Sequence, residues 1–174
     1  MDGDGRADTE WIASSPAADG SVLFGVTTAG GGTATAGISS ASPVARSVLV
    51  ADVTGAGEFI ALASDGRQVL LYALSDCTIV PVHDPQGDQY AFDLGFTGLG
   101  TGVGCVDVDG DGVHDLAGLQ ADTDGGGYTA TQVVLDGPAA RNGASTHVAA
   151  TGDEGHAITC GDLTMTDDGV TTGP

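Results

Sequence analysis

Three apolar segments that each lead into an aspartate-containing turn recur along the chain at a fixed interval. They are VLVADVTGAG at 48–57, VGCVDVDGDG at 103–112 and ITCGDLTMTDDG at 158–169. Their leading aspartates, each 55 residues after the one before, are Asp52, Asp107 and Asp162. Similarity at a constant period is the sequence signature of repeat architectures, in which each repeat is one small structural unit. We therefore expect the chain to be built from units of 55 residues.

The N-terminal sequence DGDGRADTEWIAS is a further, incomplete copy. Its Asp2, Asp4, Gly5 and Asp8 align with Asp109, Asp111, Gly112 and Asp115. In this alignment the leading aspartate would come before Met1, so we expect the chain to begin inside a repeat and to be part of a longer protein. The expected repeats span 1–46, 47–101 and 102–156, with a partial copy at 157–174, and all lie in one domain of residues 1–174.

Each turn is followed by a short apolar strand, a variable loop and another strand. The pairs are TEWIAS with SVLFGVTT, EFIALAS with QVLLYALS, and DLAGLQA with TQVVLDG. Alternating apolar residues, β-branched side chains and Gly, Asp or Ser boundaries favour strands over helices. The expected class is all-β, with three or four antiparallel strands in a repeat. Loops are expected at 28–43, 83–89, 121–127 and 137–146.

The charge of the chain restricts its partners. The formal net charge is −20, with 24 acidic and 4 basic residues. Nucleic acid and anionic membranes are excluded as expected partners because both need a basic surface. No apolar stretch approaches the roughly 20 residues that span a bilayer, so no membrane insertion is expected, and no export signal is expected in this N-terminal sequence. Cations are the natural partners of such a chain.

One loop has the ligand pattern of a calcium site. In DVDGDGVHDL, carboxylates stand at loop positions one, three, five and nine, which are Asp107, Asp109, Asp111 and Asp115. Calcium takes about six to eight oxygen ligands, and alternate residues of a tight loop can all supply them. Gly112 permits a sharp turn that directs the carbonyl of Val113 toward the ion. The alternative is an ion-free turn in which aspartates accept hydrogen bonds from backbone amides.

The other copies of this loop are less complete. An EF-hand would need a glutamate at position twelve, which here is Gly118, and helices on both sides. The N-terminal copy offers Asp2, Asp4, the carbonyl of Arg6, and Asp8 as calcium ligands. The copy at Asp52 is expected to be a metal-free turn, because Thr54, Ala56 and Ile60 replace its later aspartates. The copy at Asp162 carries an insertion of two residues.

The three cysteines leave several pairings open. Cys77, Cys105 and Cys160 form no CxxC pair and no cluster with histidine, which argues against zinc or a redox pair. Cys105 and Cys160 occupy equivalent repeat positions, matching Val50, as buried core residues would. A disulfide between them, a disulfide of either with Cys77, and buried free thiols all remain open. Trp11, Phe24 and Tyr72 are expected in the core.

No catalytic pattern is evident in the chain. GxSxG, HExxH and paired-glutamate constellations are missing, and the histidines are scattered in expected loops at His83, His114, His147 and His156. We therefore expect a non-enzymatic protein.

The pattern of an apolar strand, DxDGDGxxDL and another apolar strand resembles the FG-GAP/VCBS-type repeats of integrin-α-like β-propellers. This resemblance implies one four-stranded blade per repeat and calcium in the loop between the first two strands. It also implies a secreted or cell-surface protein that acts in adhesion or in binding a protein or glycan ligand. Three repeats and a fragment are too few to close a ring of about four to eight blades. The alternative function is an accessory or scaffold propeller of an extracellular hydrolase or lyase.

Overall fold

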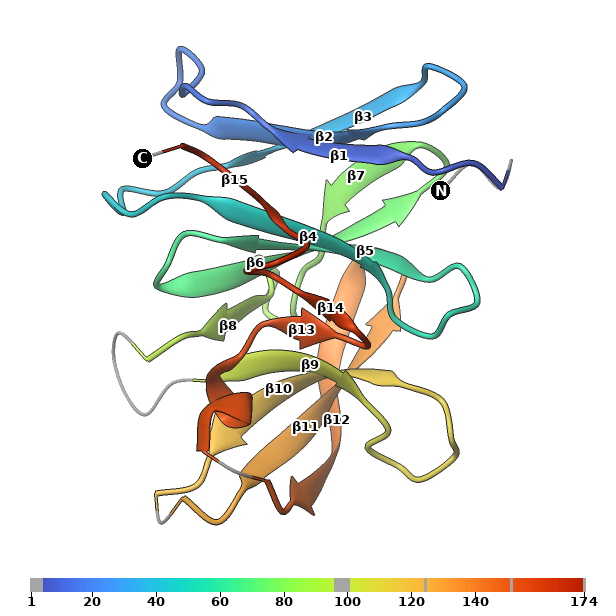
Figure 1. Cartoon of the computed structure of the whole chain (residues 1–174), viewed down its shortest axis with the longest axis vertical. Helices are drawn as coiled ribbons and strands as arrows, with labels where there is room; N and C mark the ends of the chain where they lie inside the picture. The colour runs from blue at the N-terminus through green and yellow to red at the C-terminus, as the bar shows by residue number, and fades with distance from the viewer. Residues whose placement is uncertain (1–4, 96–100, 124, 151, 174) are drawn as a thin grey trace.

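The computed structural model describes residues 5–95, 101–123, 125–150 and 152–173, and this part of the chain is all-β (Figure 1). Three antiparallel sheets are stacked along the long axis of the molecule. The first sheet contains β1 (Thr9–Ile12), β2 (Val22–Thr27) and β3 (Thr33–Ile38). The predicted all-β class is confirmed.

The second and third sheets are meanders of consecutive strands, except that β15 from the C-terminal end of the chain joins the edge of the second. The central sheet has the order β15-β4-β5-β6-β7, with β8 also paired to β6. Its strands are β4 (Ser47–Asp52), β5 (Phe59–Ser64), β6 (Gln68–Ser75), β7 (Thr78–Pro81), β8 (Ala91–Asp93) and β15 (Val170–Thr171). The third sheet consists of β9 (Gly102–Val106), β10 (Asp115–Ala121), β11 (Tyr128–Asp136) and β12 (Ala139–Val148). A 3₁₀ turn, η1 (Gly152–His156), precedes the small hairpin of β13 (Thr159–Cys160) and β14 (Leu163–Thr164).

The two full meanders share one register at their first hairpin. Val50 on β4 lies opposite Ala61 on β5, and Cys105 on β9 lies opposite Leu116 on β10. Both pairs join residues with the same separation along the chain, so the two hairpins are in the same register. Strands β4 and β9 begin at Ser47 and Gly102, the first residues of two expected repeats.

Strand β5 shows why the sheets stack. Successive side chains of a strand point to opposite faces. Ala61 and Ala63 therefore join the core between the first and central sheets, whereas Ile60 and Leu62 join the core between the central and third sheets. All four are fully buried. Burial of a side chain such as Leu62 stabilises the fold by about 1.5–3 kcal/mol.

The core contains two of the three aromatic residues expected there. Phe24 and Tyr72 are buried and pack edge to face, with ring centroids 5.1 Å apart, which joins β2 to β6. The Tyr72 hydroxyl donates a hydrogen bond to the carbonyl of Gly37 on β3. Trp11 on β1 is half-buried.

Two of the predicted loops are wrong, because each contains a strand. Strand β3 lies within 28–43, and β12 occupies most of 137–146. Both are the last strand of their sheet, and most of their residues are exposed or half-buried. Small and polar residues suffice on such an edge, so the apolar alternation that identifies inner strands is weak there.

The described sheets stack in layers, and no closed ring or barrel is formed by this part of the chain. Blades around a propeller axis therefore stay a prediction. No helix in the described ranges is long and apolar enough to cross a membrane.

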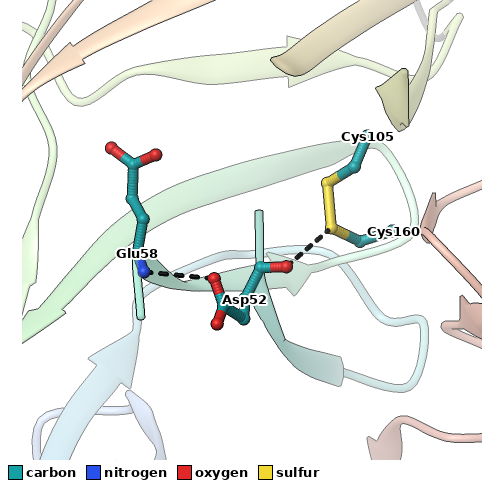
Figure 2. Close-up of a disulfide and its surroundings, with 4 residues drawn as sticks. All are labelled: Asp52, Glu58, Cys105 and Cys160. Atoms are coloured by element: carbon teal, nitrogen blue, oxygen red, sulfur yellow. Dashed lines mark hydrogen bonds between the residues drawn. A yellow bond between two sulfur atoms is a disulfide. The ribbon is translucent and has the colours of Figure 1, made fainter. Parts of the chain in front are cut away.

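A disulfide joins Cys105 on β9 to Cys160 on β13, with Cα atoms 4.5 Å apart (Figure 2). The structure thus selects one of the three open possibilities, whereas Cys77 is a free, exposed cysteine in the β6–β7 turn. The Sγ atom of Cys160 lies 4.0 Å from the carbonyl oxygen of Asp52, so β4, β9 and β13 meet at this point. Two cysteines 55 positions apart in the sequence are therefore direct neighbours here.

Candidate metal centre

The loop between β9 and β10 holds the candidate metal centre. Val106, the last residue of β9, lies opposite Asp115, the first residue of β10, so the pairing of the two strands fixes both ends of the loop. Gly110 and Gly112 have φ angles of 83° and 86°. An added Cβ at either glycine would meet no atom within 4 Å, so glycine is favoured there by backbone conformation rather than by space.

Three of the predicted ligands converge in this loop. Carboxylate oxygens of Asp107, Asp109 and Asp115 all lie within 4.8 Å of one another. Calcium binds oxygen at about 2.3–2.6 Å, so two oxygens that share one ion lie at most about 5.2 Å apart. This upper limit is compatible with one cation shared by the three carboxylates. Asp107 and Asp109 are exposed and Asp115 is half-buried, so the cluster is open to solvent on one side.

Asp107 shapes the turn through its own carboxylate. Its Oδ1 accepts hydrogen bonds from the amides of Gly110 and Asp111, at 2.7 and 3.1 Å, and its Oδ2 accepts one from Gly112 at 3.0 Å. These bonds wrap residues 108–112 around the side chain. Each carboxylate oxygen has two lone pairs, so these interactions orient Asp107 and do not by themselves exclude a cation.

Two hydrogen bonds hold the Asp115 carboxylate, one from the loop and one from the neighbouring strand β11. Its Oδ2 accepts a hydrogen bond of 3.0 Å from the Val108 amide, and its Oδ1 accepts one of 2.7 Å from the side-chain amide of Gln132 on β11. The register between β11 and β12 shifts between Thr131 and Val133, so Gln132 stands at a bulge. Bulges next to functional sites commonly redirect a side chain.

Gln132 was missed by the sequence analysis. It lies in TQVVLDG, a segment predicted only as a strand, and an isolated glutamine there resembles any polar residue on a half-exposed strand. Its role depends on a contact between strands and on a bulge. Neither has a recognisable sequence pattern.

Asp111 and Val113 are placed differently from the three clustered aspartates. Asp111 Oδ1 accepts a hydrogen bond of 2.8 Å from the Val113 amide, and the convergent group of described carboxylates consists of the other three residues. The Val113 side chain is exposed. Ligation by the Asp111 carboxylate and by the Val113 carbonyl stays a prediction.

The N-terminal copy is described only in part. Asp2 and Asp4 lie outside the described residues. Arg6 is exposed, and Asp8 is half-buried just before β1, where its Oδ1 accepts a hydrogen bond of 3.1 Å from the Ala29 amide. A cation bound by Asp2, Asp4, the Arg6 carbonyl and Asp8 also stays a prediction.

The copy at Asp52 uses its aspartate to hold the turn. Asp52 accepts hydrogen bonds from the amide of Gly57 at 2.8 Å and from the amide of Glu58 at 3.1 Å, the second of which is drawn in Figure 2. Thr54 Oγ1 accepts a bond from the Ala56 amide, and Ile60 is buried in the core. Positions that carry carboxylates in the other loop therefore carry a hydroxyl, a methyl group and a core side chain here.

The copy at Asp162 forms a shorter turn. Cys160 pairs with Leu163, so only Gly161 and Asp162 lie between β13 and β14. Gly161 has a φ angle of 60°, which suits a tight two-residue hairpin. The two residues after Asp162, Leu163 and Thr164, already belong to β14. This copy therefore does not enclose a loop of the kind that follows Asp107.

The loop at 107–115 thus offers a set of hard oxygen ligands on a rigid two-stranded support. Carboxylates of this kind suit calcium or magnesium rather than soft metals. Comparisons of the chain with protein-family models, with curated proteins and with solved structures gave no match.

Proposed function

We propose that the chain is a calcium-binding repeat module of a secreted or cell-surface protein, and that it acts in adhesion or ligand binding rather than in catalysis. The observation that carries this proposal is the convergence of Asp107, Asp109 and Asp115, whose oxygens lie within 4.8 Å of one another. The resemblance of DVDGDGVHDL to the calcium loops of FG-GAP/VCBS-type propeller repeats supports the same ion and the same setting.

The role of the ion in this proposal is structural. Bound calcium would offset most of the negative charge of three neighbouring carboxylates and join the start of the loop, at Asp107, to the start of β10, at Asp115. A site with the affinity of extracellular modules, about 10⁻⁴–10⁻³ M, gains about 0.5–1.5 kcal/mol of stability in millimolar calcium. The stiffened loop would then present a protein or glycan ligand with a fixed surface.

The binding test is a thermal melting curve recorded in calcium and in chelator. We compare the wild-type chain with Asp109→Asn, which keeps the shape of the side chain and removes its charge, and with Asp136→Asn as an exposed control outside the loop. Calcium should raise the Tm of the wild type and of the control and leave that of Asp109→Asn nearly unchanged. A wild-type Tm that does not respond to calcium, or an equal response in Asp109→Asn, contradicts the proposal.

The metal preference is tested in the same assay. Magnesium requires near-octahedral coordination at about 2.0–2.1 Å and loses its bound waters reluctantly, so a solvent-exposed loop of carboxylates suits the larger calcium ion better. We therefore expect a smaller Tm shift in magnesium than in calcium at equal concentration. A larger shift in magnesium would assign the site to that ion.

A further inference from the structure

The segment 157–172, which we call the C-terminal strap, runs along the first strands of both full meanders (Figure 1). At its beginning, Ile158 forms a parallel bridge with Val103 on β9, and the Val103 amide donates a hydrogen bond of 2.8 Å to the carbonyl of Ala157. Gly102 permits this approach, because an added Cβ would lie 2.5 Å from the same carbonyl oxygen. The strap therefore covers the edge of β9.

The other end of the strap covers the edge of β4. Val170 and Thr171 on β15 pair with Val48 and Ser47. The Thr172 amide donates to the carbonyl of Arg46 at 2.8 Å, and the Arg46 amide donates to Thr172 Oγ1 at 3.0 Å. Strands β4 and β9 would otherwise be the outermost strands on this side of their sheets, with amides and carbonyls open to solvent.

The strap is held non-covalently by short strands only. Strands β13, β14 and β15 contain two residues each. Pairings of this length are weak on their own, because each backbone hydrogen bond contributes only about 0.5–1.5 kcal/mol. The Cys105–Cys160 disulfide ties the strap to β9 covalently, and both cysteines are buried, with 5% and 4% of their surface exposed.

We propose that the disulfide is a redox-sensitive lock for the C-terminal strap, and that its reduction releases the strap from β9 and β4 while strands β1 to β12 stay folded. In the reduction a dithiol gives up two electrons and two protons and becomes a cyclic disulfide. The Cys105–Cys160 bond breaks and both residues become thiols. Because the disulfide is buried, the strap must first open locally for the dithiol to reach it.

The strap supplies few of the core side chains, namely buried Cys160 and the partly buried Ile158, Met165 and Val170. The strands of each meander pair with one another, and most of the side chains that fill the two large cores come from β2 to β12. Local release is therefore physically separable from unfolding, as expected where a segment has few buried contacts.

The test is hydrogen exchange measured by mass spectrometry on the full chain before and after treatment with dithiothreitol. All variants carry Cys77→Ser, so that the exposed thiol cannot exchange with the disulfide. On reduction, protection should fall by about tenfold or more in peptides that contain Arg46, Val103 and the strap, and stay unchanged in β5, β6 and β10. Cys105→Ser/Cys160→Ser should show the reduced pattern without dithiothreitol.

A second variant separates the lock from the strap. Gly102→Ala leaves both cysteines in place but pushes against the Ala157 carbonyl. It should lower protection at Val103 while the disulfide keeps the strap attached at Cys160. Unchanged exchange after complete reduction, confirmed by a mass increase of two hydrogens, would overturn the proposal. Loss of protection throughout all three sheets would overturn it as well, because the strap would then be inseparable from the fold.

Discussion

The side-chain amide of Gln132 donates a hydrogen bond of 2.7 Å to Oδ1 of Asp115, and this bond joins β11 to the candidate metal centre on β10. Hydrogen bonds from neighbouring residues orient metal ligands, and their loss typically costs about 10–100-fold in metal affinity. We expect Gln132→Ala to weaken calcium binding by about tenfold, measured by calorimetric titration.

The control for that change is Gln120→Ala, which removes an exposed glutamine from β10 on the same sheet. It should bind calcium like the wild type. Gly143→Ala offers an independent check of the hydrogen bond between Gln132 and Asp115, because the added Cβ would lie 2.5 Å from the side-chain oxygen of Gln132. Equal affinities for Gln132→Ala and Gln120→Ala would show that the hydrogen bond does not support the site.

Leu62 on β5 is fully buried in the core between the central and third sheets. Truncation removes buried apolar surface and leaves a cavity, so Leu62→Ala should lower the free energy of unfolding by about 2–5 kcal/mol. Leu23 on β2 is 38% exposed, and Leu23→Ala should cost less than half as much. Urea denaturation of the two variants measures the difference, and similar losses would argue against the stacked core.

Asp65 is buried at the β5–β6 turn. Burial favours the protonated form, but hydrogen bonds from the Ser40 hydroxyl and from the amides of Arg67 and Gln68, together with the charge of Arg46, hold the pKa of Asp65 below 3.8. The ionised carboxylate therefore stabilises the fold above the ordinary pKa, and this contribution is lost as pH falls through the lower folded pKa.

Asp65→Asn tests this pH dependence. At about pH 6 the variant should be less stable than the wild type by about 1–3 kcal/mol, and the difference should shrink steadily toward about pH 2. Asp19→Asn is the comparison, because hydrogen bonds from Ser21 also lower the pKa of Asp19, but Asp19 is fully exposed. Its effect should be much smaller in urea titrations at each pH. A difference for Asp65→Asn that does not vary with pH would contradict the assigned role.

Gly25 on β2 lies where the chain has no room for a side chain. An added Cβ would be 2.2 Å from the carbonyl oxygen of Ala34 and 2.7 Å from Cζ2 of Trp11. We expect Gly25→Ala to destabilise the fold by about 1–3 kcal/mol and to change the fluorescence of the single tryptophan. Gly37→Ala on β3, whose nearest neighbour would be 3.3 Å away, should leave the fluorescence unaltered. An unchanged spectrum for Gly25→Ala would show that the sheet adapts.

The inner strands could be predicted from the sequence because their residues face a core. Strand β5 is apolar nearly throughout, since Ala61 and Leu62 point into two different cores, and β6 and β10 carry similar signals. Strands β3 and β12 were missed because an outer strand needs few apolar residues. The predicted loop at 83–89 is correct. It contains no strand, and one isolated bridge pairs its first residue, His83, with its last, Gln89.

The candidate site was predictable where ligands are close in sequence. Asp107, Asp109 and Asp115 could be identified from their spacing alone, because the loop that brings them together is local. Gln132 reaches the site from another strand, and the Cys105–Cys160 disulfide depends on how two repeats pack. Spacing within one loop carries no information about either.

Strand β9 carries the disulfide at Cys105 and leads two residues later into the first clustered aspartate, Asp107. Oxidation state and cation occupancy therefore act on the same short piece of backbone. Thermodynamic linkage requires the two effects to be reciprocal. By whatever factor the intact disulfide tightens calcium binding, bound calcium shifts the equilibrium against reduction by the same factor. With the proposed calcium site, the dithiol concentration needed to open the strap should therefore change with calcium concentration by this same factor.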